Sequence, residues 1–203
     1  MAPARTDTTP GPSPRRADAQ RSIDRILDAT LDALASDPEA SMAAIARRAG
    51  VVRATVYVHF PTRENLIEAV TQRAISDVTD AVEAVEPARG DPADALRRVL
   101  TAAWRTLGRF HALVEVNARL PHADLHAMHQ PVLALLVPLI ERGQRDGTFR
   151  SDVPAAWHLS MLLALIHAAS GELRAGRMSQ EAVEAALVRT VLGAIIEREQ
   201  ETE

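Results

Sequence analysis

The sequence contains no cysteine and no lysine, and only 3% of its 203 residues are Phe, Trp or Tyr. The absence of cysteine excludes disulfides and thiolate-ligated metal sites. Arginine supplies all 23 basic residues, which we attribute to a GC-rich genome rather than to function. The few aromatic residues stand out, because three ring-bearing side chains fall within four residues, at Tyr57, His59 and Phe60.

Long apolar runs are also missing. VLALLVPLI and MLLALIHAA are far shorter than the roughly 20 residues of a membrane-spanning helix. Residues 1–20 lack the apolar core of a signal peptide. We therefore expect a cytoplasmic protein without membrane contact. At 47% hydrophobic and 25% charged residues, the chain has the composition of a globular protein with a buried core.

The net charge of −4 is unevenly distributed along the chain. Residues 1–63 carry nine arginines against seven acidic residues, whereas residues 64–203 carry fourteen against twenty. A mildly basic head on an acidic body is typical of a small nucleic-acid-binding module attached to another domain.

Helical periodicity dominates the sequence after residue 18. Apolar residues recur at steps of three and four, and we find no alternating strand pattern and no internal repeat. Residues 1–18, with four prolines, predict a disordered arm. We predict an all-α fold of about nine helices, with a three-helix N-terminal domain over 19–65 and a larger helical domain over 66–203.

Two short helices separated by a glycine are predicted between residues 41 and 60. Ser41 can cap the first, and Gly50 can end it in a left-handed conformation. Residues 52–59 form the second, which Pro61 ends. This is the outline of a helix-turn-helix, whose second helix enters the DNA major groove.

The residue types of the second short helix suit DNA binding, with Val56 and Phe60 predicted to pack inward. The opposite face presents four side chains that can contact base edges or phosphates: Arg53, Thr55, Tyr57 and His59. Helix pairs with a glycine turn also occur in proteins that never touch DNA, so spacing alone leaves that alternative open.

The segment SMAAIARRAGVVRATVYVHFPTRENLIEAV, residues 41–70, resembles the N-terminal domain of the tetracycline-repressor (TetR) family of bacterial transcriptional regulators. The AxxAGV turn, the TxYxHF run and the start of the next helix carry this resemblance, which is strong over residues 19–70. It implies a homodimer that binds a double-stranded DNA operator and whose C-terminal domain binds a small-molecule effector. Two departures are Val52, where the family often has a capping residue, and Val58, where it often has a large or polar one.

Carried over position by position, the resemblance implies seven DNA-binding residues. Ser41 caps the motif and approaches a phosphate, Arg53, Ala54 and Thr55 face base edges, Tyr57 and His59 contact backbone or thymine, and Arg63 binds phosphate.

The resemblance also implies an effector cavity among the C-terminal helices. When a small, mainly hydrophobic ligand binds there, the protein is released from a palindromic operator. We expect a repressor rather than an activator. The candidate ligand-binding residues are Trp104, Leu107, Phe110, His111, Glu115, Met128, Leu135, Trp157 and Met161.

The last two helices, near 154–174 and 179–198, are predicted to form the homodimer interface. AAWHLSMLLALIHAA is apolar on nearly all sides, more than one half-exposed helix needs. An apolar stripe on the final helix is assigned to the same interface: Val183, Ala186, Leu187, Val191, Ala194 and Ile195. The alternative is that both helices cover the core of their own monomer.

Parts of the sequence are compatible with two other functions. His122, His126 and His129 have spacings that can place imidazoles on one helix face, so a metal-responsive regulator is the alternative, although no bound metal or cofactor is predicted. His111 and Glu115 are one helical turn apart and resemble an acid–base pair. No nucleotide-binding or hydrolase motif accompanies them, and we predict that the protein is not an enzyme.

Overall fold

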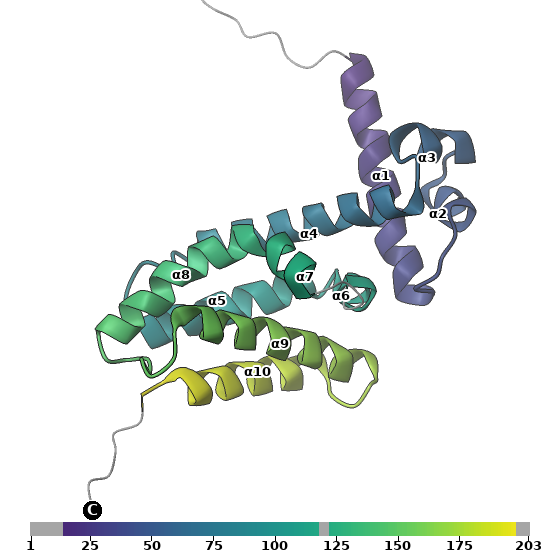
Figure 1. Cartoon of the computed structure of the whole chain (residues 1–203). Helices are drawn as coiled ribbons and strands as arrows, with labels where there is room; N and C mark the ends of the chain where they lie inside the picture. The colour runs from purple at the N-terminus through teal and green to yellow at the C-terminus, as the bar shows by residue number, and fades with distance from the viewer. Residues whose placement is uncertain (1–13, 118–121, 198–203) are drawn as a thin grey trace, which may run out of the picture. The chain divides into compact units, whose positions relative to one another are not determined.

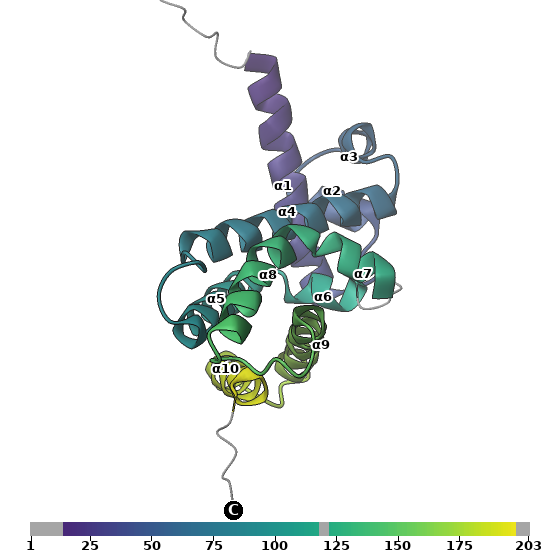
Figure 2. The same cartoon turned by 60° about the vertical axis from the view of Figure 1, so that its left-hand side comes forward.

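The computed structural model describes residues 14–117 and 122–197. All the regular secondary-structure elements in these ranges are α-helices. The all-α prediction is confirmed, with ten helices in the described ranges against about nine predicted (Figures 1 and 2). In chain order they are α1 (Pro14–Ser36), α2 (Met42–Ala49), α3 (Arg53–His59), α4 (Arg63–Ala84), α5 (Pro92–Leu107), α6 (His111–Asn117), α7 (His122–Met128), α8 (Gln130–Arg145), α9 (Ala155–Arg174) and α10 (Gln180–Ile195).

The chain divides into two compact units, Met1–Leu66 and Ile67–Glu203. Helices α1 to α3 and the first turn of α4 belong to the first unit, and the rest of α4 with α5 to α10 belongs to the second. Most of the predicted arm, residues 1–13, lies outside the described residues. The arm prediction is wrong from Pro14 onward, where α1 already begins. Proline is compatible with a first helical turn, where its missing N–H costs no hydrogen bond.

The first unit is held together by the apolar face of α1. Ile26, Leu27 and Leu34 are buried on this face, and α1 packs against α2, which packs against α3. A polar contact reinforces the first pair, since Arg48 Nη1 donates to the carbonyl oxygen of Asp32 at 2.8 Å.

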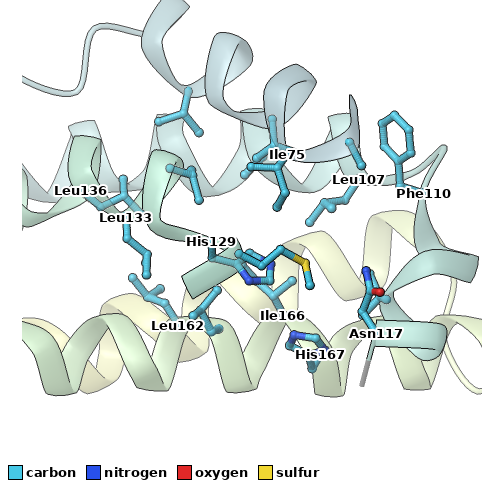
Figure 3. A pocket seen from close by; sticks show the side chains of 18 of the residues that line it. Ile75, Leu107, Phe110, Asn117, His129, Leu133, Leu136, Leu162, Ile166 and His167 are labelled. Atoms are coloured by element: carbon cyan, nitrogen blue, oxygen red, sulfur yellow. The ribbon is translucent and has the colours of Figure 1, made fainter. Parts of the chain in front are cut away.

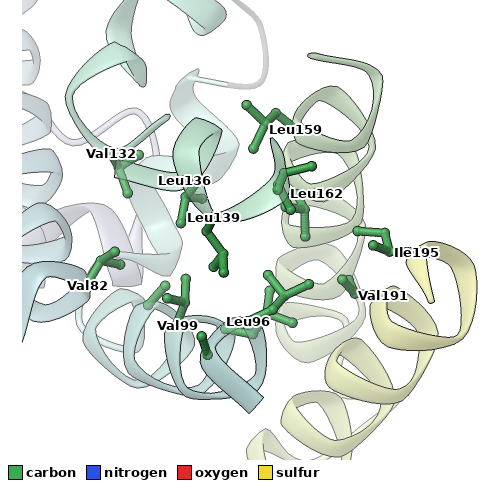
Figure 4. Close-up of a cluster of buried hydrophobic side chains, with 14 of the residues drawn as sticks. Val82, Leu96, Val99, Val132, Leu136, Leu139, Leu159, Leu162, Val191 and Ile195 are labelled. Atoms are coloured by element: carbon green, nitrogen blue, oxygen red, sulfur yellow. The ribbon is translucent and has the colours of Figure 1, made fainter. Parts of the chain in front are cut away.

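The core of the second unit lies between α5, α8, α9 and α10, with part of α4 at its edge (Figure 4). Leu96, Leu139, Leu162 and Ile195 contribute to it from four different helices. Asp91 starts α5 as predicted, because its carboxylate accepts from the N–H groups of Ala93 and Asp94.

A glycine in α8 makes room for one aromatic anchor of this core. A Cβ atom at Gly143 would lie 2.1 Å from the ring of Phe149, so residue 143 must lack a side chain for the ring to pack there. Phe149 is buried, and its backbone pairs with Ile196 in an isolated antiparallel bridge. The loop after α8 is thereby attached to the end of α10.

The apolar stripe of α10 faces the core of its own monomer, and its assignment to a partner-facing surface was wrong. Val183, Leu187, Val191 and Ile195 are all buried within the second unit. An apolar stripe shows that a helix face is covered but does not show which surface covers it.

The prolines between residues 109 and 145 have different effects. Pro121 lies outside the described residues, Pro131 falls in the first turn of α8, and Pro138 lies inside α8 without ending it. None of the helices in the described ranges is long and apolar enough to span a lipid bilayer.

Candidate DNA-binding surface and ligand cavity

The turn between α2 and α3 has the local geometry that its residues predict. Ser41 Oγ accepts from the backbone N–H of Ala44 at 3.3 Å and caps α2. Gly50 ends α2 with φ 65°, a left-handed conformation that favours glycine. Val52 precedes α3 without a side-chain capping bond, as its aliphatic side chain requires.

Helix α3 has one buried face and one exposed face. Val56 and Phe60 are buried in the first unit, which confirms their predicted role as core anchors. Ala54 and Val58 are each two residues from Val56, about 200° around the helix, and both are exposed. They therefore lie at the centre of the outward face.

Arg53 and Tyr57 form one flank of this outward face. Arg53 Nη2 donates to the Tyr57 hydroxyl at 3.0 Å, and its guanidinium carbon lies 5.2 Å from the centre of the Tyr57 ring. The pair is one helical turn apart, so each side chain restricts the rotamers of the other. Thr55 and His59 lie on the opposite flank and are half-buried.

Arg63 makes backbone contacts within the first unit. Its Nη2 donates to the carbonyl oxygen of Pro38 at 2.7 Å, and its Nε donates to that of Ala40 at 3.4 Å. Thr62 Oγ1 accepts from the N–H of Asn65 at 3.1 Å and caps the start of α4. The first turn of α4 is thus fixed to the segment that precedes α2. The predicted phosphate contact of Arg63 stays a prediction.

Two valines on this surface were described from the sequence only as departures from the family, one lacking a capping group and the other a large or polar side chain. Val52 is 70% exposed and Val58 is 78% exposed. The exposure of Val58 could have been predicted from the sequence, because Val58 lies on the opposite side of the helix from the inward-facing Val56.

The second unit encloses an apolar cavity of about 90 Å³ (Figure 3). Its walls come from α4 to α9. Aliphatic side chains dominate them, and the polar side chains among the described lining residues are Thr71, Asn117, His129 and His167.

Asn117 and Thr71 are hydrogen-bonded to each other, since Asn117 Nδ2 donates to Thr71 Oγ1 at 3.1 Å. His129 Nδ1 lies 2.7 Å from the carbonyl oxygen of Leu125. The rings of His129 and His167 meet nearly edge-on, with centroids 6.2 Å apart and an interplanar angle of 74°. Burial is the main cause that lowers the pKa of both imidazoles, so both favour the neutral form.

Three of the predicted ligand-binding residues, Leu107, Phe110 and Met128, line this cavity. Trp104 and His111 do not line it and instead pack against each other, with ring centroids 4.9 Å apart. Burial lowers the pKa of His111.

The remaining candidates are elsewhere or outside the description. Trp157 and Met161 border a separate, more open hollow, and Leu135 is half-buried against the core without lining either space. The side chain of Glu115 lies outside the described part of the chain. The sequence interpretation missed His167 and the lining residues of α4, among them Ile75, because apolar helix positions read as ordinary core.

The described side chains of the predicted histidine cluster, His126 and His129, do not come together at one site. His129 points into the cavity and pairs with His167 rather than His126. The side chain of His122 lies outside the described residues. Among the residues that are described, no group of three or more His, Cys, Asp or Glu side chains is placed to hold a metal ion.

Comparison with known proteins agrees with this geometry. Residues 26–70 match the family model "Bacterial regulatory proteins, tetR family". The HTH-type transcriptional repressor LfrR of Mycolicibacterium smegmatis is 28% identical over 190 residues, which cover 91% of this chain and 96% of LfrR. The HTH-type transcriptional regulator NfxB of Pseudomonas aeruginosa is 26% identical over 157 residues, which cover 76% of this chain and 83% of NfxB.

The crystal structure of LfrR from Mycobacterium smegmatis in complex with proflavine is similar to this chain with a TM-score of 0.67. The match is 26% identical and covers 88% of this chain and 99% of LfrR.

The fold and the α2–turn–α3 surface define a helix-turn-helix DNA-binding protein. Residues 26–70 carry the N-terminal domain of the TetR family, and the chain is similar over most of its length to the TetR-like regulator LfrR, so the resemblance inferred from residues 41–70 is confirmed.

Proposed function

We propose that the protein is a homodimeric repressor that binds a palindromic operator in the bacterial cytoplasm. A small, mainly hydrophobic effector enters the cavity of the second unit and releases the dimer from DNA. The observation that carries this proposal is the position of α4. Its first turn belongs to the DNA-binding unit, whereas Thr71, Ile75 and Val78 from the same helix line the cavity.

The cavity volume supports a ligand-driven change in α4. An apolar cavity of roughly 150 Å³ is large enough for benzene, and this one encloses about 90 Å³. An effector of two or more rings is therefore accommodated better when the helices separate. Such a ligand binds the expanded state better than the closed one, which is the differential affinity that shifts a population. Coupling of about 1–3 kcal/mol is typical of allosteric proteins.

The character of the walls supports a hydrophobic effector. The described lining residues include no charged side chain, and burying an unpaired charge in such surroundings is costly. LfrR, a relative crystallised in complex with proflavine, supports a small-molecule ligand for this chain as well.

The dimer interface is assigned to the outward face of α9 and the end of α10. Trp157 is 63% exposed beside the hollow lined by Met161, Gly193 and Ile196. The same hollow is lined by Arg150, Asp152 and Glu197, and a large exposed aromatic beside a hollow with apolar and charged walls is typical of a surface that another chain covers.

The test combines DNA capture with release. Genomic fragments retained by the purified protein are sequenced, and an enriched palindrome is labelled for anisotropy measurements with a library of apolar compounds. We expect at least one compound to release the operator. The matched control is Ala103→Leu, which adds volume to the cavity wall and should keep operator binding while losing release. Release that persists in this variant would place the effector elsewhere.

A further inference from the structure

His129 presents a hydrogen-bond acceptor to the cavity. Its Nδ1 lies 2.7 Å from the carbonyl oxygen of Leu125, and a carbonyl oxygen can only accept. Nδ1 must therefore carry the hydrogen. In a neutral imidazole the other nitrogen, Nε2, then has a free lone pair and no hydrogen.

The surroundings keep this acceptor in place. Burial disfavours the charged imidazole and lowers the pKa of His129, and the nearby His126 lowers it further, although the bond to Leu125 opposes them. His167 meets the ring of His129 edge-on, and burial lowers the pKa of His167 as well. No arginine or carboxylate is present among the described lining residues to recruit a proton to the pair.

Of the polar side chains in the described lining, Asn117 and Thr71 are already bonded to each other. His129 Nε2 has no hydrogen-bond partner among the described residues. Figure 3 shows the His129 ring among aliphatic side chains from several helices. A ligand that brings a donor to Nε2 gains a hydrogen bond in a largely apolar environment, where unmet polar groups are costly.

We propose that His129 is the polar anchor of the cavity and selects an uncharged, largely apolar molecule that carries a hydroxyl or N–H donor. This inference rests on the proposed function, because it concerns the cavity assigned there to the effector. His129 acts as a specificity-determining residue. The aliphatic walls supply affinity, and Nε2 distinguishes molecules that carry a donor from equally apolar molecules without one.

Three probes of nearly equal size test the proposal by calorimetry on the full chain: 2-naphthol, 2-methoxynaphthalene and 2-naphthoate. The first carries a donor, the second replaces it with a methyl ether, and the third is an anion. We expect the naphthol to bind about tenfold more tightly than the ether, the worth of one neutral hydrogen bond. The naphthoate should bind most weakly, since its charge has no partner among the described walls.

The decisive variant is His129→Leu. It should bind the ether as the unaltered protein does and should lose the preference for naphthol. His129 makes no side-chain capping bond to α8, so the substitution removes no cap. His129→Gln, which can return an acceptor to the cavity, should restore part of the preference. His126→Leu, at a histidine that does not line the cavity, is the matched control and should leave it unchanged.

A naphthol preference that survives in His129→Leu would overturn the proposal, as would tightest binding of naphthoate or no binding of any probe. The proposed function fails differently. It falls if no operator is found or if Ala103→Leu still releases DNA, and both results are independent of the probe series.

Discussion

Arg63 and Pro38 are joined by a hydrogen bond from the guanidinium Nη2 to the proline carbonyl oxygen, with a length of 2.7 Å. This bond attaches the first residue of α4 to the segment before α2. Arg63 therefore acts as a brace within the DNA-binding unit, which differs from the phosphate contact that the family resemblance implies.

Arg63→Gln distinguishes the two roles. Loss of this bond should destabilise residues 38–63 by about 1.5–3 kcal/mol, the range for a hydrogen bond that involves a charged group, as measured by hydrogen exchange. The slope of log affinity against log salt should not change. A phosphate contact would instead reduce that slope by about 0.9. Arg47→Gln, an exposed arginine on α2, is the control for stability.

Val58 should read thymine. Its exposed isopropyl group lies at the centre of the outward face of α3, and apolar side chains contact the thymine methyl in the major groove. Replacing one thymine of the operator with uracil should weaken binding about fourfold, the worth of one buried methyl group. Val58→Ala should abolish that sensitivity. Anisotropy with a series of single uracil substitutions tests this, and indifference at every thymine would contradict it.

Trp157→Glu should give a folded monomer. The indole is 63% exposed, so the substitution removes little from the core of the monomer, but it places a charge in the proposed interface. Sedimentation velocity should show the change in mass, with helix content retained by circular dichroism. Trp157→Phe should remain dimeric. A dimer that persists with glutamate would move the interface away from this face.

Gly143→Ala should destabilise the second unit by about 1–3 kcal/mol, the usual cost of overpacking a core. The added Cβ would lie 2.1 Å from the Phe149 ring. Chemical denaturation measures the effect. Phe149→Leu makes room for the methyl group, so the double variant should lose less stability than the sum of the two single variants. Simple additivity would show that the clash is relieved elsewhere.

Stability should fall as the pH drops below 6.5. Burial lowers the pKa of His111, His129 and His167 from this value, so the unfolded chain takes up protons before the folded chain does. The free energy of unfolding is then highest above pH 6.5 and declines toward the folded-state pKa values. His111→Leu should reduce the slope, since both ring nitrogens of His111 are buried without a hydrogen-bond partner. An unchanged slope in denaturation series would contradict this.

Local signals in the sequence were sufficient for the DNA-binding motif. Ser41 and Gly50 act through hydrogen bonds and backbone conformation within a few residues of themselves, and the inward phase of Val56 follows from helical periodicity alone. These features need no knowledge of distant parts of the chain. The start of α1 was misplaced because prolines predicted an arm, although Pro14 is compatible with a first helical turn.

The contacts that were missed depend on the tertiary fold. The acceptors of Arg63 are backbone carbonyl groups. Every residue has such a group, so the residue types in the sequence do not indicate which carbonyl accepts the bond. The α10 stripe was assigned outward because periodicity defines a face without naming its neighbour. Ile75 and His167 line the cavity, yet in the sequence they are ordinary members of helical patterns.

Because the cavity is small, binding of a ligand in it and release of the protein from DNA need not occur together. If the proposed function holds, a molecule small enough to fit within about 90 Å³ would enter without displacing α4 and would stabilise the arrangement described above. Such a molecule would act as an antagonist, holding the protein on its operator and competing with larger inducers. The response would then depend on molecular size with a threshold, so that adding one ring to a silent scaffold converts it into an inducer.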